Sequence, residues 1–269
     1  MPISAQTPTA RAREIAWRSR PLPQRLHEAQ AGLAPAVTTE DSGATEVANR
    51  LTSWRRAVAD GDVAAFNRRL AWDNLDGEVA RRALVMGPAP EAWQPPLWAE
   101  ILDRILTDDA ATADSSTADS LPTPRTPPPA GLPAPIVRWV VPFLVAIDPE
   151  IEAFLDTRLD PGWITDAAWV DLASALWLDL AQRLAPFVAT EGKRPLAELL
   201  GEFPGLARAC CILTLSWLRR SRELVGRLED DRAILAACLG CDTLPPLVGV
   251  EARLGDPHEG ARRVMRLRF

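Results

Sequence analysis

The sequence has few lysines, tyrosines and histidines, and it has no long hydrophobic run. Lys193 is the only lysine, tyrosine is absent, and His27 and His258 are the only histidines. The net charge is −6, and no basic tract with interleaved aromatic residues is present. These features argue against a general nucleic-acid-binding protein.

The N-terminal residues and the apolar stretches indicate in which compartment the protein is expected. Residues 1–20 carry arginines and prolines where a secretory signal needs an apolar segment, so we expect a cytoplasmic protein. The most apolar stretches, 139–147 and 209–218, have about half of the roughly 20 residues that cross a bilayer. Both stretches are expected in the core, and no membrane span is predicted.

Four cysteines are the remaining candidates for metal or redox chemistry. In the cytoplasm Cys210, Cys211, Cys238 and Cys241 are expected to be reduced thiols. Cys238 and Cys241 have the spacing of half a zinc site, but a structural zinc needs four ligands. No second pair with this spacing is present. Packing of all four cysteines in a core is therefore the favoured interpretation, and no metal site is predicted.

Apolar residues recur every three or four positions over most of the chain, which predicts a mainly helical protein. Thr165 and Asp166 form a good N-cap pair for the longest of these helices. The tryptophans on apolar helix faces are expected in the core, and they are Trp54, Trp72, Trp98, Trp169, Trp177 and Trp217. The predicted helices cover 10–18, 45–60, 63–72, 75–86, 95–109, two short pieces within 136–160, 165–187, 196–203, 205–217 and 222–239.

Changes in composition divide the chain into five parts. Residues 1–45 are expected to be a partly disordered tail with one short helix, and 46–109 an N-terminal helical subdomain. Residues 110–135 are rich in Pro, Ser and Thr and are predicted to be a linker or insertion. A second helical subdomain over 136–241 is followed by a β-hairpin over 242–269.

The last part of the chain changes from a helical period to a period of two. Val248, Val250, Ala252 and Leu254 alternate with other residues, and the same alternation returns from Met265 to Phe269. This pattern predicts two short strands joined by a loop. The fold class is therefore mainly α with a C-terminal β-hairpin.

The loop of this hairpin has the residues to bind an anion. Gly255 and Gly260 enclose Asp256 and His258, and the pair Arg262 and Arg263 follows. Glycine lets backbone N–H groups approach a phosphate, and arginine binds phosphate through two parallel hydrogen bonds. An ordinary polar hairpin turn, in which Asp, Pro and Gly are common, is the alternative.

The order of motifs toward the C-terminus resembles the dehydratase region of type II lanthipeptide synthetases, the LanM class. The motifs are PGLAR from Pro204, LVGRL at 224–228 with Asp231, and VGVEARLGDPHEGARRVMRLRF at the end. Weaker matches upstream are Leu51, Trp54 and Arg55, then Phe66 with Arg69 and Leu70, then Trp98, and then Pro142 with Phe143. The resemblance covers about 46–269.

This resemblance implies an enzyme that phosphorylates Ser and Thr side chains of a precursor peptide with ATP and Mg²⁺. The enzyme then eliminates phosphate to leave dehydroamino acids. It also implies a kinase-like lobe with added helical regions, so that 242–269 would be the first strands of that lobe in an α+β fragment.

The loop residues take their expected roles from the same resemblance. Asp256, His258 and Arg262 match family positions that act in phosphate transfer and elimination, and Gly260 matches the first glycine of the motif. The chemistry of the loop, rather than the resemblance, makes Gly255, Gly260 and Arg263 the residues expected to bind the nucleotide phosphates. The sequence departs from the family pattern at Ala261, where a second glycine is usual, and at Arg263, where a small hydroxyl residue is common.

The resemblance further implies that this chain is an N-terminal fragment and catalytically incomplete as it stands. In the family the nucleotide-binding lysine, the metal ligands and the zinc site of the cyclase follow the second strand. A precursor peptide, and the remainder of the synthetase acting in trans, would then be the partners. The alternative is a non-catalytic helical module that binds a precursor (leader) peptide or a partner enzyme.

Overall fold

A computed structural model describes residues 8–31, 42–85, 88–114, 123–158, 162–192, 194–252 and 264–269. Within these residues the chain forms twelve helices and one two-stranded antiparallel sheet. The predicted fold class, mainly α with a C-terminal hairpin, is confirmed. Contacts divide the chain into a small unit, Ala16–Gln94, and a large unit, Met1–Ile15 with Pro95–Phe269. The two units are described separately.

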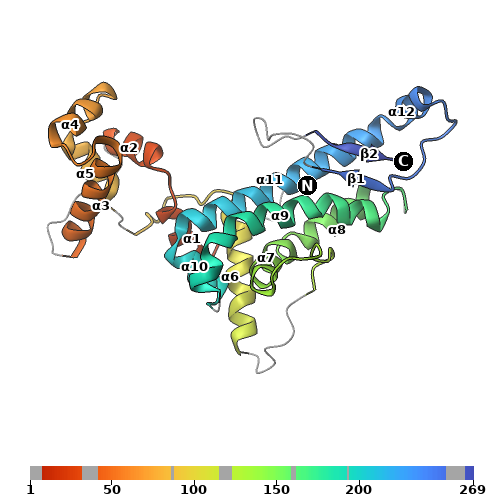
Figure 1. Ribbon diagram of the computed structural model, residues 1–269, viewed down its shortest axis with the longest axis horizontal. Helices are drawn as coiled ribbons and strands as arrows, with labels where there is room; N and C mark the ends of the chain where they lie inside the picture. The colour runs from red at the N-terminus through yellow and green to blue at the C-terminus, as the bar shows by residue number, and fades with distance from the viewer. Residues whose placement is uncertain are drawn as a thin grey trace. The chain divides into compact units, whose positions relative to one another are not determined.

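The small unit holds four helices within its bounds (Figure 1). Two of them begin at an aspartate, because the carboxylate accepts hydrogen bonds from the first free N–H groups of the helix. Asp62 accepts one from Ala65, and Asp76 accepts two, from Glu78 and Val79, each at 2.8–2.9 Å. The helices are α2 (Leu22–Gln30), α3 (Ser42–Ala59), α4 (Val63–Trp72) and α5 (Gly77–Leu84).

Two apolar clusters stabilise the small unit. Ala29 of α2 packs with Val79 and Ala83 of α5, and Phe66 and Leu70 of α4 pack with α5 and α3. The helix α2 lies inside the segment 1–45 that was expected to be a partly disordered tail. It forms because Leu22 and Leu26 contact the first cluster, a tertiary contact that the sparse apolar pattern did not indicate.

One tryptophan of this unit departs from its prediction. Trp72, expected in the core, is 76% exposed. It is the last residue of α4, and it lies beyond Phe66 and Leu70, which turn the apolar face of that helix inward. Trp54 is half-buried and contacts Phe66 edge to face, with ring centroids 5.1 Å apart.

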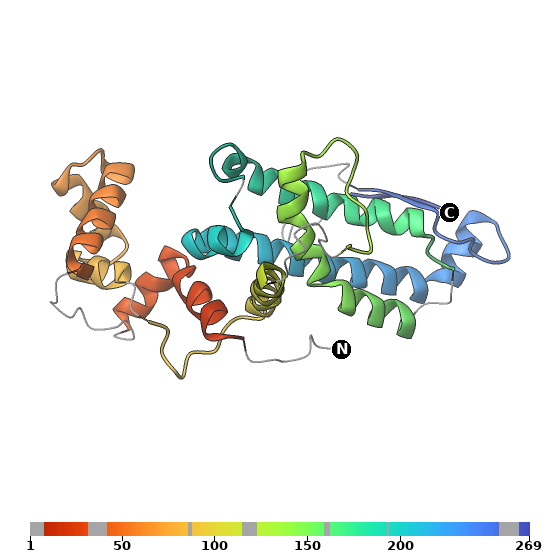
Figure 2. The same ribbon diagram turned by 90° about the horizontal axis from the view of Figure 1, so that it is seen from below.

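The large unit is organised around two long helices that lie side by side, α9 and α11 (Figures 1 and 2). Shorter helices cover them, and the sheet lies against α9. The elements of this unit are the start of α1 (Ala10–Arg18), α6 (Trp98–Asp114), α7 (Ala134–Val145), α8 (Asp148–Arg158), α9 (Asp166–Glu191), α10 (Leu196–Glu202), α11 (Pro204–Asp230), α12 (Arg232–Leu239), β1 (Gly249–Glu251) and β2 (Arg266–Arg268).

The core of the large unit is built from the apolar faces of these helices. Its tryptophans agree with the prediction, since Trp98, Trp169, Trp177 and Trp217 are buried. A buried indole N–H is usually paired with an acceptor, and a backbone carbonyl serves this purpose for Trp217 and for the further buried tryptophan Trp139. Trp139 donates to the carbonyl of Arg194 at 3.1 Å, and Trp217 donates to that of Leu172 at 3.2 Å.

Two predicted boundaries are wrong. The helices expected over 205–217 and 222–239 are instead α11, which is continuous to Asp230, and α12 after it. Leu218, Ser221 and Val225 carry the buried stripe of α11 through the expected gap. Likewise α6 enters the segment 110–135 predicted to be a linker and runs to Asp114, in keeping with the high helix propensity of its alanines.

The cysteines fall into two pairs with different environments. Cys210 and Cys211 are buried in α11 as expected, and burial raises the pKa of the Cys210 thiol to about 12. Cys238 was expected in the core, but it is exposed, because it lies on the outer side of the short helix α12. Among the described residues no group of three or more His, Cys, Asp or Glu side chains is placed to hold a metal ion.

Two further observations concern long apolar helices and the left-handed turn after α12. No single helix in the described part of the chain is long and apolar enough to cross a bilayer; only α10 and α11 taken together, bent by 115°, reach that length and composition. Gly240 ends α12 with φ of 70°, in the left-handed conformation that glycine adopts without strain.

Candidate functional site

The C-terminal hairpin is the element on which the sequence places its candidate chemistry. β1 and β2 pair antiparallel, with Gly249 opposite Arg268, Val250 opposite Leu267 and Glu251 opposite Arg266. Gly249 and Val250 are buried and Glu251 is exposed. An ion pair at 2.8 Å joins Arg266 to Glu251 across the exposed face.

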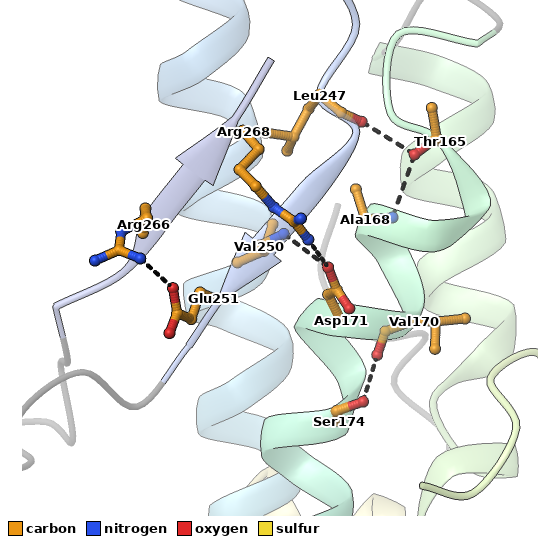
Figure 3. A network of polar contacts seen from close by, with 10 residues as sticks. All are labelled: Thr165, Ala168, Val170, Asp171, Ser174, Leu247, Val250, Glu251, Arg266 and Arg268. Atoms are coloured by element: carbon orange, nitrogen blue, oxygen red, sulfur yellow. Dashed lines mark hydrogen bonds and ion pairs between the residues drawn. The ribbon is translucent and has the colours of Figure 1, made fainter.

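One carboxylate of α9 holds both strands of the hairpin (Figure 3). Oδ2 of Asp171 accepts a hydrogen bond from the backbone N–H of Val250 at 3.0 Å. The same oxygen lies 3.3 Å from a guanidinium nitrogen of Arg268. Because the N–H of Val250 is part-buried, Asp171 satisfies a donor that would otherwise lose its partner. We call this set of contacts the Asp171 clasp.

A second attachment lies just before β1. Leu247 forms a parallel bridge with Ile164, so its N–H donates to the carbonyl of Trp163 at 2.8 Å. Its carbonyl accepts from the backbone N–H of Thr165 at 3.0 Å and from the Thr165 hydroxyl at 3.2 Å (Figure 3). The hydroxyl of Thr165 also caps α9 by accepting from Ala168, so one side chain fixes both the helix start and the hairpin.

Gly249 provides the space that the clasp needs. A Cβ atom at this position would lie 2.4–2.7 Å from the guanidinium group of Arg268, closer than any real contact. The Arg268 side chain therefore crosses β1 at Gly249 to reach Asp171. Since the crowding atoms belong to a flexible side chain, a larger residue at 249 would displace Arg268 while leaving the backbone in place.

A cavity of about 370 Å³ lies between α9, α11 and the hairpin, and we call it the hairpin groove. Leu172 and Leu176 of α9 and Trp217 of α11 form much of its apolar wall. Ala252 and Met265 close it on the side of the hairpin. A volume of this size fits within the range of small-ligand sites, which take one or two side chains or a compact molecule.

Charged residues surround the apolar wall of the hairpin groove. Asp179 of α9 and Arg220 of α11 line it, and Glu223 and Arg227 of α11 form an exposed ion pair at its edge. Ser221 is 4% exposed and brings a hydroxyl into the otherwise apolar lining. The groove therefore combines apolar contact area with donors and acceptors of both charges, as sites for peptides and organic ligands do.

The predicted site residues lie in the loop between the strands. Gly255, Asp256, His258, Gly260, Arg262 and Arg263 all lie outside the described residues. Their roles stay predictions. On either side of the loop, Ala252 and Met265 line the hairpin groove. The segment that carries the predicted chemistry is thus joined to the groove at both of its ends.

Comparison with known proteins gives one family for this part of the chain. A family model described as "Domain of unknown function (DUF4135)" matches residues 203–269, which include α11, α12 and the hairpin. This domain is found in lanthipeptide synthetase-like proteins. Neither a curated protein nor a solved structure matches the chain.

The residues that position the hairpin were not predicted from the sequence. Asp171 is 79 residues before Val250 and 97 before Arg268, so no local pattern joins them. A signal was available, because Asp171 interrupts an apolar run in the first turns of α9 and is only half-exposed. A carboxylate at such a position usually has a partner, but the sequence does not say which.

Proposed function

We propose that the hairpin and its loop are part of the phosphate-handling region of a lanthipeptide dehydratase. Such an enzyme phosphorylates Ser and Thr side chains of a precursor peptide and then eliminates the phosphate. The observation that carries this proposal is the family match over 203–269, which ends on a hairpin whose loop contains Asp256, His258 and Arg262.

The proposed chemistry has two steps. In the first, the Ser or Thr hydroxyl gives its proton to a base and its oxygen forms a bond to the γ-phosphorus of ATP, while the bond from that phosphorus to the bridging oxygen breaks and ADP leaves. In the second, a base removes the Cα proton and the Cβ–O bond breaks, so that phosphate leaves. Arg262 suits the binding of phosphate through two N–H groups, and His258 suits proton transfer near neutral pH.

The described residues supply neither a metal site nor a lysine for this chemistry. They place no group of His, Cys, Asp or Glu side chains that would hold Mg²⁺, so we assign no metal ligand among them. Phosphotransferases also use a lysine on the nucleotide phosphates, and the only lysine, Lys193, precedes the matched region and is not described. We therefore expect the chain by itself to bind without turnover.

The hairpin groove supports a second function, a helical module that binds a precursor (leader) peptide or a partner enzyme. Its apolar wall, which includes Trp217, is open to a side chain of a bound peptide, and the charges of Asp179 and Arg227 lie where peptide polar groups would pass. This proposal needs no turnover. The module requires the hairpin groove, whereas the dehydratase proposal requires the loop with Asp256, His258 and Arg262.

One titration tests the helical module and the expected lack of turnover. The purified chain is mixed with ATP–Mg²⁺ and a candidate leader peptide, and peptide binding, ADP release and peptide phosphorylation are measured. We expect binding with no ADP release. A substitution Leu224→Arg, which places a charge in the groove lining, is expected to abolish peptide binding if the module is correct, whereas Arg262→Ala is not. Phosphorylation by the chain alone would contradict the expected lack of turnover, and absence of peptide binding would contradict the module.

A further inference from the structure

The small unit contains a second cavity, of about 480 Å³, which we call the small-unit groove. It lies between α3, α4 and α5, and it is separate from the hairpin and from the proposed function. Three helices whose positions are fixed by caps and packing enclose it. Asp62 caps α4, Asp76 caps α5, and Trp54 of α3 contacts Phe66 of α4. The groove is therefore preformed.

Apolar side chains form the floor and part of the edge of the small-unit groove. Phe66 and Leu70 are buried beneath it, and Leu51 and Leu75 are partly buried beside them. Val63, at the start of α4, is 53% exposed and also lines the groove. This arrangement leaves apolar surface open to solvent, and covering that surface with an apolar side chain of a partner would be favourable.

The charges of the groove favour an anionic partner. Arg55 and Arg81 line it, as does Asp76. The Asp76 carboxylate is already bound by two backbone N–H groups at the start of α5, so it balances the helix end. Arg81 has only an exposed contact at 3.3 Å with Glu78, which contributes little.

Arg55 gives stronger evidence for an anionic partner than Arg81 does. It has no ion-pair partner within the part of the chain that the structure describes, although it is half-buried. Its Nε atom is buried and has no hydrogen-bond acceptor. The rest of the Arg55 side chain is partly exposed and lines the groove, so a carboxylate bound there would gain a charge-assisted hydrogen bond from the guanidinium group.

We propose that the small-unit groove binds an acidic amphipathic peptide segment of a partner protein. One or two apolar side chains of the segment contact the floor at Leu51 and Val63, and flanking carboxylates pair with Arg55 and Arg81. A basic segment would meet two guanidinium groups at this place. Nucleic acid fits poorly, because two cations over an apolar floor provide neither a phosphate track nor an exposed stacking ring among the lining residues.

The test uses the full chain and fluorescein-labelled synthetic peptides, with binding followed by fluorescence anisotropy. The probe repeats Glu-Glu-Leu-Leu, and its neutral match repeats Gln-Gln-Leu-Leu. We expect the acidic probe to bind and to weaken as salt is raised, with the neutral match at least about tenfold weaker. Arg55→Gln should raise Kd about tenfold and Arg81→Gln about threefold. Arg68→Gln, on α4 but outside the groove lining, is the matched control and should leave Kd unchanged.

Three results would overturn the proposal. The first is equal binding of the acidic and neutral probes, and the second is an Arg68→Gln variant that weakens binding as much as Arg55→Gln. The third is a dimer of this chain in light scattering that Arg81→Gln dissociates, since the groove would then bind a second copy. Arg81 is exposed, so its variant is expected to stay folded, and circular dichroism of each variant checks this.

Discussion

Trp217→Ala is expected to lower the free energy of unfolding by about 3–5 kcal/mol, the usual cost of removing a buried tryptophan side chain. Trp217 is 9% exposed, it contacts Trp169 edge to face with ring centroids 6.0 Å apart, and its N–H donates to Leu172. The substitution removes the packing between α9 and α11 and a wall of the hairpin groove. Urea unfolding followed by circular dichroism measures the loss.

Two further variants separate the causes of that loss. Trp217→Phe keeps an aromatic ring against Trp169 but removes the hydrogen bond to Leu172, so we expect a cost of about 1–2 kcal/mol. Trp72→Ala removes a tryptophan that is 76% exposed and should change stability by no more than about 0.5 kcal/mol. A Trp217→Ala protein as stable as Trp72→Ala would refute the described packing of α9 on α11.

Asp171→Ala is expected to release the hairpin from α9. The buried N–H of Val250 then has no acceptor, which costs about 1–3 kcal/mol. The lost contact to Arg268 adds little, because both side chains are largely exposed. Since the change is local, we expect amide hydrogen exchange in residues 248–252 to become about tenfold faster or more, with little change in α11.

Matched substitutions make this result specific. Asp171→Asn keeps a carbonyl oxygen that can accept from Val250, so exchange in the hairpin should change only slightly. Asp230→Ala removes an exposed aspartate from the end of α11 and should have no effect on the hairpin. Unchanged hairpin exchange in Asp171→Ala would show that the clasp does not hold the strands.

The sequence predicted the elements whose signals are local. The N-cap Thr165 and the two strands of the hairpin each depend on a few neighbouring residues, and both are present. Short-range hydrogen bonds and side-chain periodicity determine such features, so they can be recognised without knowing the rest of the fold.

The features that were not predicted from the sequence depend on contacts between distant segments. The helix α2 forms because it packs on α5, and the expected break in α11 is absent because its buried stripe packs on several helices, α6 and α9 among them. The Asp171 clasp and the hairpin groove likewise bring together residues from α9, α11 and the C-terminus. No single stretch of sequence contains these partners, so periodicity alone does not predict them.

For the candidate site, the sequence predicts the types of residue that could act on phosphate but not their positions in the fold. Asp256, His258 and Arg262 were selected for the reactions of their side chains, and they lie outside the described residues. What the structure adds is the support on either side of them, namely the clasp to α9 and the groove lined by Ala252 and Met265. We therefore propose that this supported hairpin presents its loop to phosphate.

Hydrogen exchange of the hairpin with and without ATP–Mg²⁺ tests this claim most directly. We expect the nucleotide to slow exchange in residues 248–252 and 264–268, and Arg262→Ala to abolish the slowing. Arg219→Ala, which removes an exposed arginine of α11 outside the groove lining, should preserve it. Hairpin exchange that does not respond to ATP–Mg²⁺, or slowing that persists in Arg262→Ala, would contradict the account.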